Sequence, residues 1–159
     1  MRFCLIDRIR SFEPGARLAA VKTVALCEEY LADHFPSFPV LPGVFMLEAM
    51  TQAGAWLVRL TDDFQHSMVV LHEARNIKYA DFVAPGARLE IEVEILAAEE
   101  SLIKLKGRGE IDGDLAVSGR LTLRRFNLAD EQSEKAYLDR QITNHFRQMK
   151  SILMAPVAR

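Results

Sequence analysis

Hydrophobic and polar residues alternate along three consecutive segments in the second half of the chain. In 89–96 (LEIEVEIL) aliphatic side chains alternate with three glutamates, and the period of two continues through 101–111 and 115–124. This period is typical of strands with one buried and one solvent-facing side. The sequence DGD at 112–114 is a hairpin signal. These segments therefore predict an antiparallel meander.

A long apolar helix is predicted from 42 to 60. Pro42 suits the first turn of a helix, and most positions from Val44 to Leu60 are apolar. A helix that is apolar around most of its circumference has to be surrounded by protein. Together with shorter candidate strands at 21–26 and 67–79, the pattern predicts an α+β fold in which one long antiparallel sheet wraps around a central helix.

The composition changes beyond Phe126. The segment 127–159 is polar and has no strand pattern, so we expect a C-terminal helical extension on a domain that spans 1–126. Asn127 is the expected N-cap, with Asp130 three residues later. We expect this helix to dock an apolar stripe on the sheet or on a partner. The stripe has i, i+4 spacing and consists of Leu138, Ile142, Phe146, Met149 and Leu153.

Composition and charge narrow the class of protein. The 159 residues are 50% hydrophobic and carry a formal net charge of -2, which argues against nucleic-acid binding. No segment is long and apolar enough to span a bilayer, and Asp7 interrupts the apolar N-terminal run, so a signal peptide is not expected. Cys4 and Cys27 fit neither a disulfide framework nor a metal site and are expected to be buried thiols. We therefore expect a soluble cytoplasmic protein.

One acid and one histidine stand out against this background. Glu48 lies in the apolar helix with Gln52 four residues later on the same face. Taken alone, such a glutamate is more often held by a buried partner, and a single histidine such as His34 is usually structural. Prolines at 36, 39 and 42 stiffen the loop between them, and the helix N-terminus offers unpaired N–H groups. A base, an acid and an oxyanion site are the parts of an elimination next to a carbonyl.

The segment HFPSFPVLPGVFMLEAMTQ, residues 34–52, closely resembles the active-site segment of the hot-dog-fold (3R)-hydroxyacyl-[acyl-carrier-protein] dehydratases, the FabZ and FabA types. The spacing from His34 to Glu48 matches that family, and a glutamate at 48 is similar to the FabZ-like branch. The segments 4–9 (CLIDRI) and 78–95 resemble its flanking strands. The resemblance covers roughly 3–125 and implies the hot-dog fold and a hydro-lyase activity.

The resemblance also implies a role for each residue of the motif. His34 would remove the C2 proton of a 3-hydroxyacyl thioester, and Glu48 would protonate the leaving 3-hydroxyl group. A neutral histidine is available near neutral pH, and burial favours the protonated form of a carboxyl group. The backbone N–H of Gly43 would polarise the thioester carbonyl, the carbonyl of Val40 would support His34, and Gln52 would support Glu48.

Substrate and partners follow from the same resemblance. The substrate would be carried on the phosphopantetheine arm of an acyl carrier protein, with no other cofactor and no metal. The family implies a homodimer in which histidine and acid come from different subunits, and it leaves assembly into hexamers open. The acyl chain would run through an apolar tunnel lined by Phe35, Phe45 and Phe82. Basic candidates for carrier docking are Arg59, Arg75, Lys78 and Arg88.

The chain departs from the family pattern around the motif. Asp33 replaces the usual glycine before the histidine, and Ala80 and Asp81 replace an arginine pair. Ser37 and Phe38 stand where Gly-His is common. These changes affect access, chain length and partner more than the His34 and Glu48 pair. Two other classes stay open from the sequence: a hot-dog acyl thioesterase, and a non-catalytic acyl-binding or assembly subunit.

Overall fold

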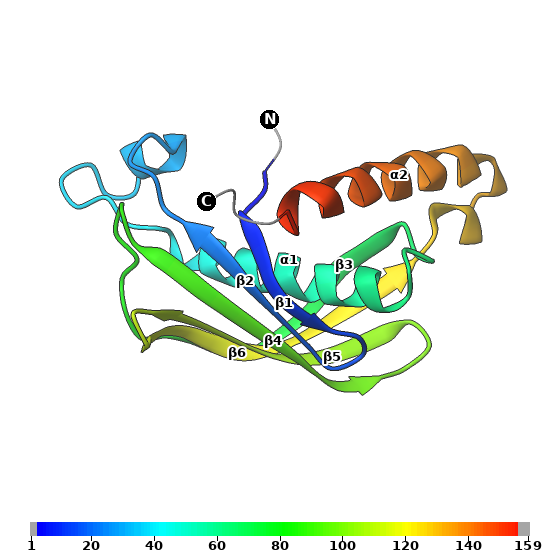
Figure 1. Cartoon of the computed structure of the whole chain (residues 1–159), viewed down its shortest axis with the longest axis horizontal. Coiled ribbons are helices and arrows are strands. Elements are labelled where there is room, and N and C mark those ends of the chain that lie inside the picture. Colours follow the sequence, from blue (N-terminus) through cyan, green and yellow to red (C-terminus); the bar gives the residue numbers. More distant parts are fainter. Residues whose placement is uncertain (1–2, 156–159) are drawn as a thin grey trace.

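The computed structural model describes residues 3–155 and has one six-stranded sheet with two long helices (Figure 1). Neighbouring strands are antiparallel, in the order β1-β2-β4-β5-β6-β3. The strands are β1 (Arg8–Glu13), β2 (Arg17–Thr23), β3 (Met68–Tyr79), β4 (Arg88–Ala98), β5 (Leu102–Ile111) and β6 (Asp114–Phe126). The helices are α1 (Gly43–Thr61), α2 (Ala136–Leu153) and the short 3₁₀ helices η1 (Glu29–Ala32), η2 (Leu128–Asp130) and η3 (Ser133–Lys135).

The sheet wraps around α1, as the sequence predicts. Alternate residues of β4 and β5 face the helix, and the helix buries Ala49, Met50, Ala53 and Leu57 with no exposed surface. The sheet can approach closely because Gly107 leaves room: a Cβ atom there would lie 3.0 Å from Sδ of Met50. The hot-dog architecture is therefore confirmed.

The predicted meander is confirmed within one or two residues at each strand end. Asp112 and Gly113 form its second hairpin turn, between β5 and β6, with φ values of 51° and 95°, which this turn type requires. On the outer face, Arg108 of β5 lies 3.4 Å from Glu92 of β4, so the basic and acidic rows pair across strands.

The N-terminal strands differ from the prediction. β1 begins at Arg8 rather than within 4–7, because the backbone N–H of Leu5 donates to the side chain of Gln52 instead of to a strand. β2 ends at Thr23, whose N–H donates to Oδ2 of Asp7. The prediction of buried cysteines is wrong: Cys4 precedes β1 and Cys27 follows β2, and both are exposed.

α2 packs on α1 and also contacts the edge strand β1, and α1 lies between most of the sheet and α2 (Figure 1). Phe146 makes an edge-to-face contact with Trp56, with ring centroids 5.6 Å apart. Asn127 caps η2 and not α2, which starts at Ala136. Of the predicted C-terminal extension, residues 156–159 lie outside the described part of the chain. Within 3–155, no helix is long and apolar enough to cross a membrane.

Candidate active site

The N-terminus of α1 presents backbone donors. The carbonyl of Pro42 accepts hydrogen bonds from the N–H groups of Phe45 (2.8 Å) and Met46 (3.2 Å). Among the hydrogen bonds of residues 3–155, none is donated by the backbone N–H of Gly43 or Val44. Unpaired N–H groups at the positive end of a helix bind carbonyl or anionic oxygen atoms.

The ring of Tyr79 covers the start of the helix. A Cβ atom on Gly43 would lie 3.1 Å from Cε1 of Tyr79, so glycine allows this close approach. The aromatic ring of Tyr79 therefore lies directly beside the first residue of α1.

The loop before α1 holds His34 by both backbone and side chain. Nδ1 of the ring lies 3.2 Å from the carbonyl oxygen of Val40, and the N–H of Val40 donates to the carbonyl of His34 at 3.1 Å. If Nδ1 carries the proton and donates to Val40, Nε2 is left as an acceptor. Asp33 forms no hydrogen bond or ion pair with His34 among the described residues.

Glu48 is held by the neighbouring amide. Nε2 of Gln52 donates to Oε1 of Glu48 at 2.9 Å and also lies 3.2 Å from the carbonyl of Phe3. Oε1 of Gln52 accepts the N–H of Leu5 at 2.9 Å. One side chain thus fixes the carboxyl group and ties α1 to the N-terminal segment.

Glu48 opens into a pocket of about 500 Å³. The pocket lies between α1, the start of β3, the N-terminal segment and α2. His34 does not line this pocket. Its further lining residues include Phe3, Trp56, Arg59, Val70, His145 and Phe146.

The aromatic residues predicted to line the tunnel lie outside this pocket. Phe35 is 51% exposed and stacks against the ring of His34, with centroids 4.3 Å apart. Phe82 is 62% exposed and packs edge-to-face with Phe38 at 5.6 Å. Phe45 instead packs between Phe3 and Tyr30.

Sequence reasoning missed one residue of the Glu48 pocket, Trp56, and misplaced two others, Arg59 and Phe146. Trp56 and Arg59 share the face of α1 that carries Glu48, at a helical spacing that the sequence contains. Phe146 belongs to the apolar stripe that the sequence predicts, but the sequence does not indicate that it contacts Trp56 and Arg59 of α1. The expectation that Arg59 docks a carrier protein at the surface is wrong, because only 6% of the residue is exposed.

The described residues provide no group of His, Cys, Asp and Glu that could hold a metal ion. The groups that the site offers are one imidazole, one carboxyl group and the N–H groups at the start of α1.

A family model described as the FabA-like domain matches residues 1–120. The chain belongs to this family. The 3-hydroxyacyl-[acyl-carrier-protein] dehydratase FabZ of Bacillus velezensis is 35% identical over 120 residues, which are 76% of this chain and 85% of that one. The FabZ of a Janthinobacterium species is 38% identical over 130 residues, covering 77% and 82% of the two chains. Within this family, the chain is similar to FabZ enzymes over about three quarters of its length.

Solved structures support the fold. A chain of the dehydratase heterocomplex ApeI:P from Xenorhabdus doucetiae superposes with a TM-score of 0.65 at 19% identity, covering 84% of this chain and 90% of that one. At this identity the likeness concerns the hot-dog fold alone.

Proposed function

We propose that His34 and Glu48 are the catalytic pair of this FabZ-type enzyme. The enzyme is a hydro-lyase that dehydrates 3-hydroxyacyl-[acyl-carrier-protein] thioesters in fatty acid biosynthesis. The observation that carries the assignment of the pair is local: each residue is fixed by one hydrogen bond that leaves its reactive atoms free. Val40 holds Nδ1 of His34, and Gln52 holds one oxygen atom of Glu48.

The proposed reaction needs no further cofactor. The thioester carbonyl accepts a hydrogen bond from the N–H of Gly43, and the helix dipole stabilises the charge that develops on its oxygen atom. Nε2 of His34 takes the C2 proton, and the electron pair of the C2–H bond forms the C2–C3 double bond. The C3–O bond breaks as Glu48 gives its proton to the hydroxyl group, which leaves as water. Exchange with solvent then returns His34 and Glu48 to their starting states.

We propose a homodimer in which each site takes His34 from one subunit and Glu48 from the other. The absence of His34 from the Glu48 pocket supports this arrangement, as does an apolar surface near the start of α1. Its exposed side chains are Val44 (64%) in the first turn of α1 and the contacting rings of Phe38 (52%) and Phe82 (62%). Exposed apolar clusters of this kind are typical of interfaces. Within 3–155, β3 is an edge strand of the sheet, which leaves its outer backbone groups available for pairing with a second chain.

Basic residues near the loop between β3 and β4 are our candidates for binding the carrier protein. Arg75, Lys78 and Arg88 are exposed and lie near the two ends of the loop between β3 and β4. We assign them to docking of an acidic carrier protein, with the substrate on its phosphopantetheine arm. We place the enzyme in the cytoplasm, with 1–126 as the catalytic domain and 127–159 as a helical extension.

The proposal is tested with purified protein and a 3-hydroxyacyl carrier thioester, analysed by mass spectrometry. The wild type is expected to give loss of water with the thioester intact, whereas a thioesterase would give free acid. His34→Ala and Glu48→Gln are each expected to lower turnover by at least about a hundredfold, the usual scale for a general acid or base. Unchanged turnover in both variants would contradict the assignment of the pair.

A further inference from the structure

Arg59 is a buried cation without a counterion in direct contact. Only 6% of the residue is exposed, and its buried Nε atom has no hydrogen-bond partner. No carboxylate among residues 3–155 forms an ion pair with it. Burial lowers the pKa of Arg59 to about 10, against a weaker opposing effect of Asp62. The group is therefore still charged at neutral pH, and a buried charge of this kind is costly unless it acquires a partner.

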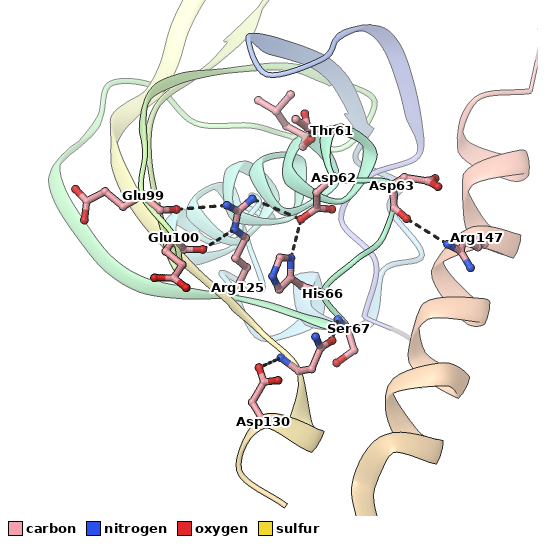
Figure 2. A network of polar contacts seen from close by, with 12 residues as sticks. Thr61, Asp62, Asp63, His66, Ser67, Glu99, Glu100, Arg125, Asp130 and Arg147 are labelled. Carbon is pink, nitrogen blue, oxygen red and sulfur yellow. Dashed lines mark hydrogen bonds and ion pairs between the residues drawn. The ribbon is translucent and has the colours of Figure 1, made fainter. Parts of the chain in front are cut away.

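The nearest acid is already shared by other groups. Oδ2 of Asp62 lies 2.8 Å from Nδ1 of His66 and 3.6 Å from Nη1 of Arg125, as Figure 2 shows. Arg125 completes its contacts with the backbone carbonyls of Glu99 and Glu100, not with their carboxylates. The other oxygen of Asp62, Oδ1, is buried without a hydrogen-bond partner, and Asp62 acts on Arg59 only through its charge, without an ion pair. Its single negative charge therefore lies near two guanidinium groups, Arg59 and Arg125, which leaves one positive charge in excess when His66 is neutral.

Arg59 faces the same pocket as the proposed catalytic acid. Eleven positions separate Glu48 and Arg59, which is about three helical turns, so both lie on one face of α1 about 16 Å apart along its axis. Trp56 and residues of β3 and α2 form largely apolar walls between them. The pocket therefore has an acid at one end and a cation at the other.

The donors of Arg59 are free to bind a ligand. Its Cζ atom lies 3.8 Å from the ring centroid of Phe146, a separation typical of a guanidinium stacked on an aromatic ring. Stacking uses the face of the group and leaves the N–H donors in its plane available. These donors match a carboxylate, which can accept two of them side by side.

We propose that this pocket takes acyl chains that end in a carboxylate, and that Arg59 binds this distal group. The inference rests on the proposed function and names its substrate class: 3-hydroxyacyl thioesters whose far end is a second carboxyl group. An extended chain of about ten carbon–carbon bonds is about 12 Å long, and with a hydrogen bond at each end it spans the roughly 16 Å between Glu48 and Arg59. A chain with a methyl end would leave the buried cation unpartnered.

The test compares two carrier thioesters of equal length, 3-hydroxydodecanoyl and 3-hydroxydodecanedioyl, by kcat/KM of dehydration. The wild type is expected to prefer the second by about tenfold or more. Arg59→Met keeps the length and apolar packing of the side chain and is expected to abolish this preference, while Arg59→Lys retains part of it. Arg147→Met is the matched control: it removes a positive charge outside the pocket, where Arg147 donates to the backbone carbonyl of Asp63, and is expected to leave the preference unchanged.

Binding separates this inference from the proposed function. Calorimetric Kd values for both thioesters are measured in a His34→Ala background, with and without Arg59→Met, so that turnover is not required. A tenfold preference for the dicarboxylic chain that disappears with Arg59→Met supports the inference even if dehydration is not observed. Equal binding of the two thioesters, or a preference that persists in folded Arg59→Met and Arg59→Lys, overturns it. Equal binding is also the result expected if a carboxylate of the partner subunit pairs with Arg59, and the inference is then wrong as well.

Discussion

Replacing Gln52 by leucine tests whether this amide positions the proposed acid. The side chain makes three hydrogen bonds, to Glu48, to the carbonyl of Phe3 and to the N–H of Leu5. Leucine has a similar size and can make none of them. The substitution therefore removes the support of Glu48 and the link between α1 and the N-terminal segment in one step.

The size of the effect follows from these contacts. Each hydrogen bond contributes about 1 kcal/mol, and the N–H of Leu5, a residue only 2% exposed, is left without a partner. We expect Gln52→Leu to lower the free energy of unfolding by about 2–4 kcal/mol. We expect kcat to fall about tenfold, which corresponds to about 1.4 kcal/mol of lost orientation of Glu48. KM should change little, because the amide does not belong to the reacting atoms.

Urea unfolding and steady-state kinetics at saturating substrate measure the two quantities. Thr61→Val is the control: its hydroxyl group also links α1 to another segment, through the N–H of Gly15 at 2.9 Å, but at the opposite end of the helix. This variant should lose stability by about 1 kcal/mol and keep its kcat. A kcat within twofold of the wild type for Gln52→Leu, despite the loss of stability, would refute the positioning role.

Two further predictions concern the sheet and α2. Gly109→Ala would place a Cβ atom 2.8 Å from Cγ1 of Val117 and 2.9 Å from Cδ1 of Leu89, so we expect a loss of about 1–3 kcal/mol in urea unfolding. Burial raises the pKa of Asp139, but hydrogen bonds from Ser67, Leu128 and Ala129 outweigh it and lower the pKa overall. This stabilisation exists above the ordinary carboxyl pKa of about 3.9 and is lost as the pH falls below it. Fluorescence of Trp56, the single tryptophan, should report α2 loosening in acid, and Asp139→Asn should remove that acid dependence.

The sheet and the central helix were predictable because each carries a strong local pattern. Alternation in β4 to β6 and apolarity around α1 reflect the burial of one face of each strand and of most of the helix. The β1–β2 hairpin was harder to predict, because β1 is an edge strand whose pattern of exposure does not alternate cleanly. The start of α2 was missed because Asn127 and Asp130 form a complete capping box on a single short turn before the helix.

Part of the candidate site could also be predicted from the sequence, and part of it could not. The spacing of His34 and Glu48 could be read from the sequence because it lies within one continuous segment. The burial of Arg59 could not, since an arginine in the last turn of a helix is ordinarily favoured by the helix dipole and exposed to solvent. Its environment depends on Phe146, which reaches it from α2 and lies far away along the chain.

Mixing two inactive variants tests most directly whether imidazole and carboxyl groups from different subunits share one site. His34→Ala and Glu48→Gln are unfolded together, refolded in equal amounts and assayed, with hybrid dimers counted by native mass spectrometry. About half of the dimers should be hybrids with one intact site each, so the mixture should recover about a quarter of the wild-type activity. Hybrid dimers that form in this proportion and remain inactive would contradict the account.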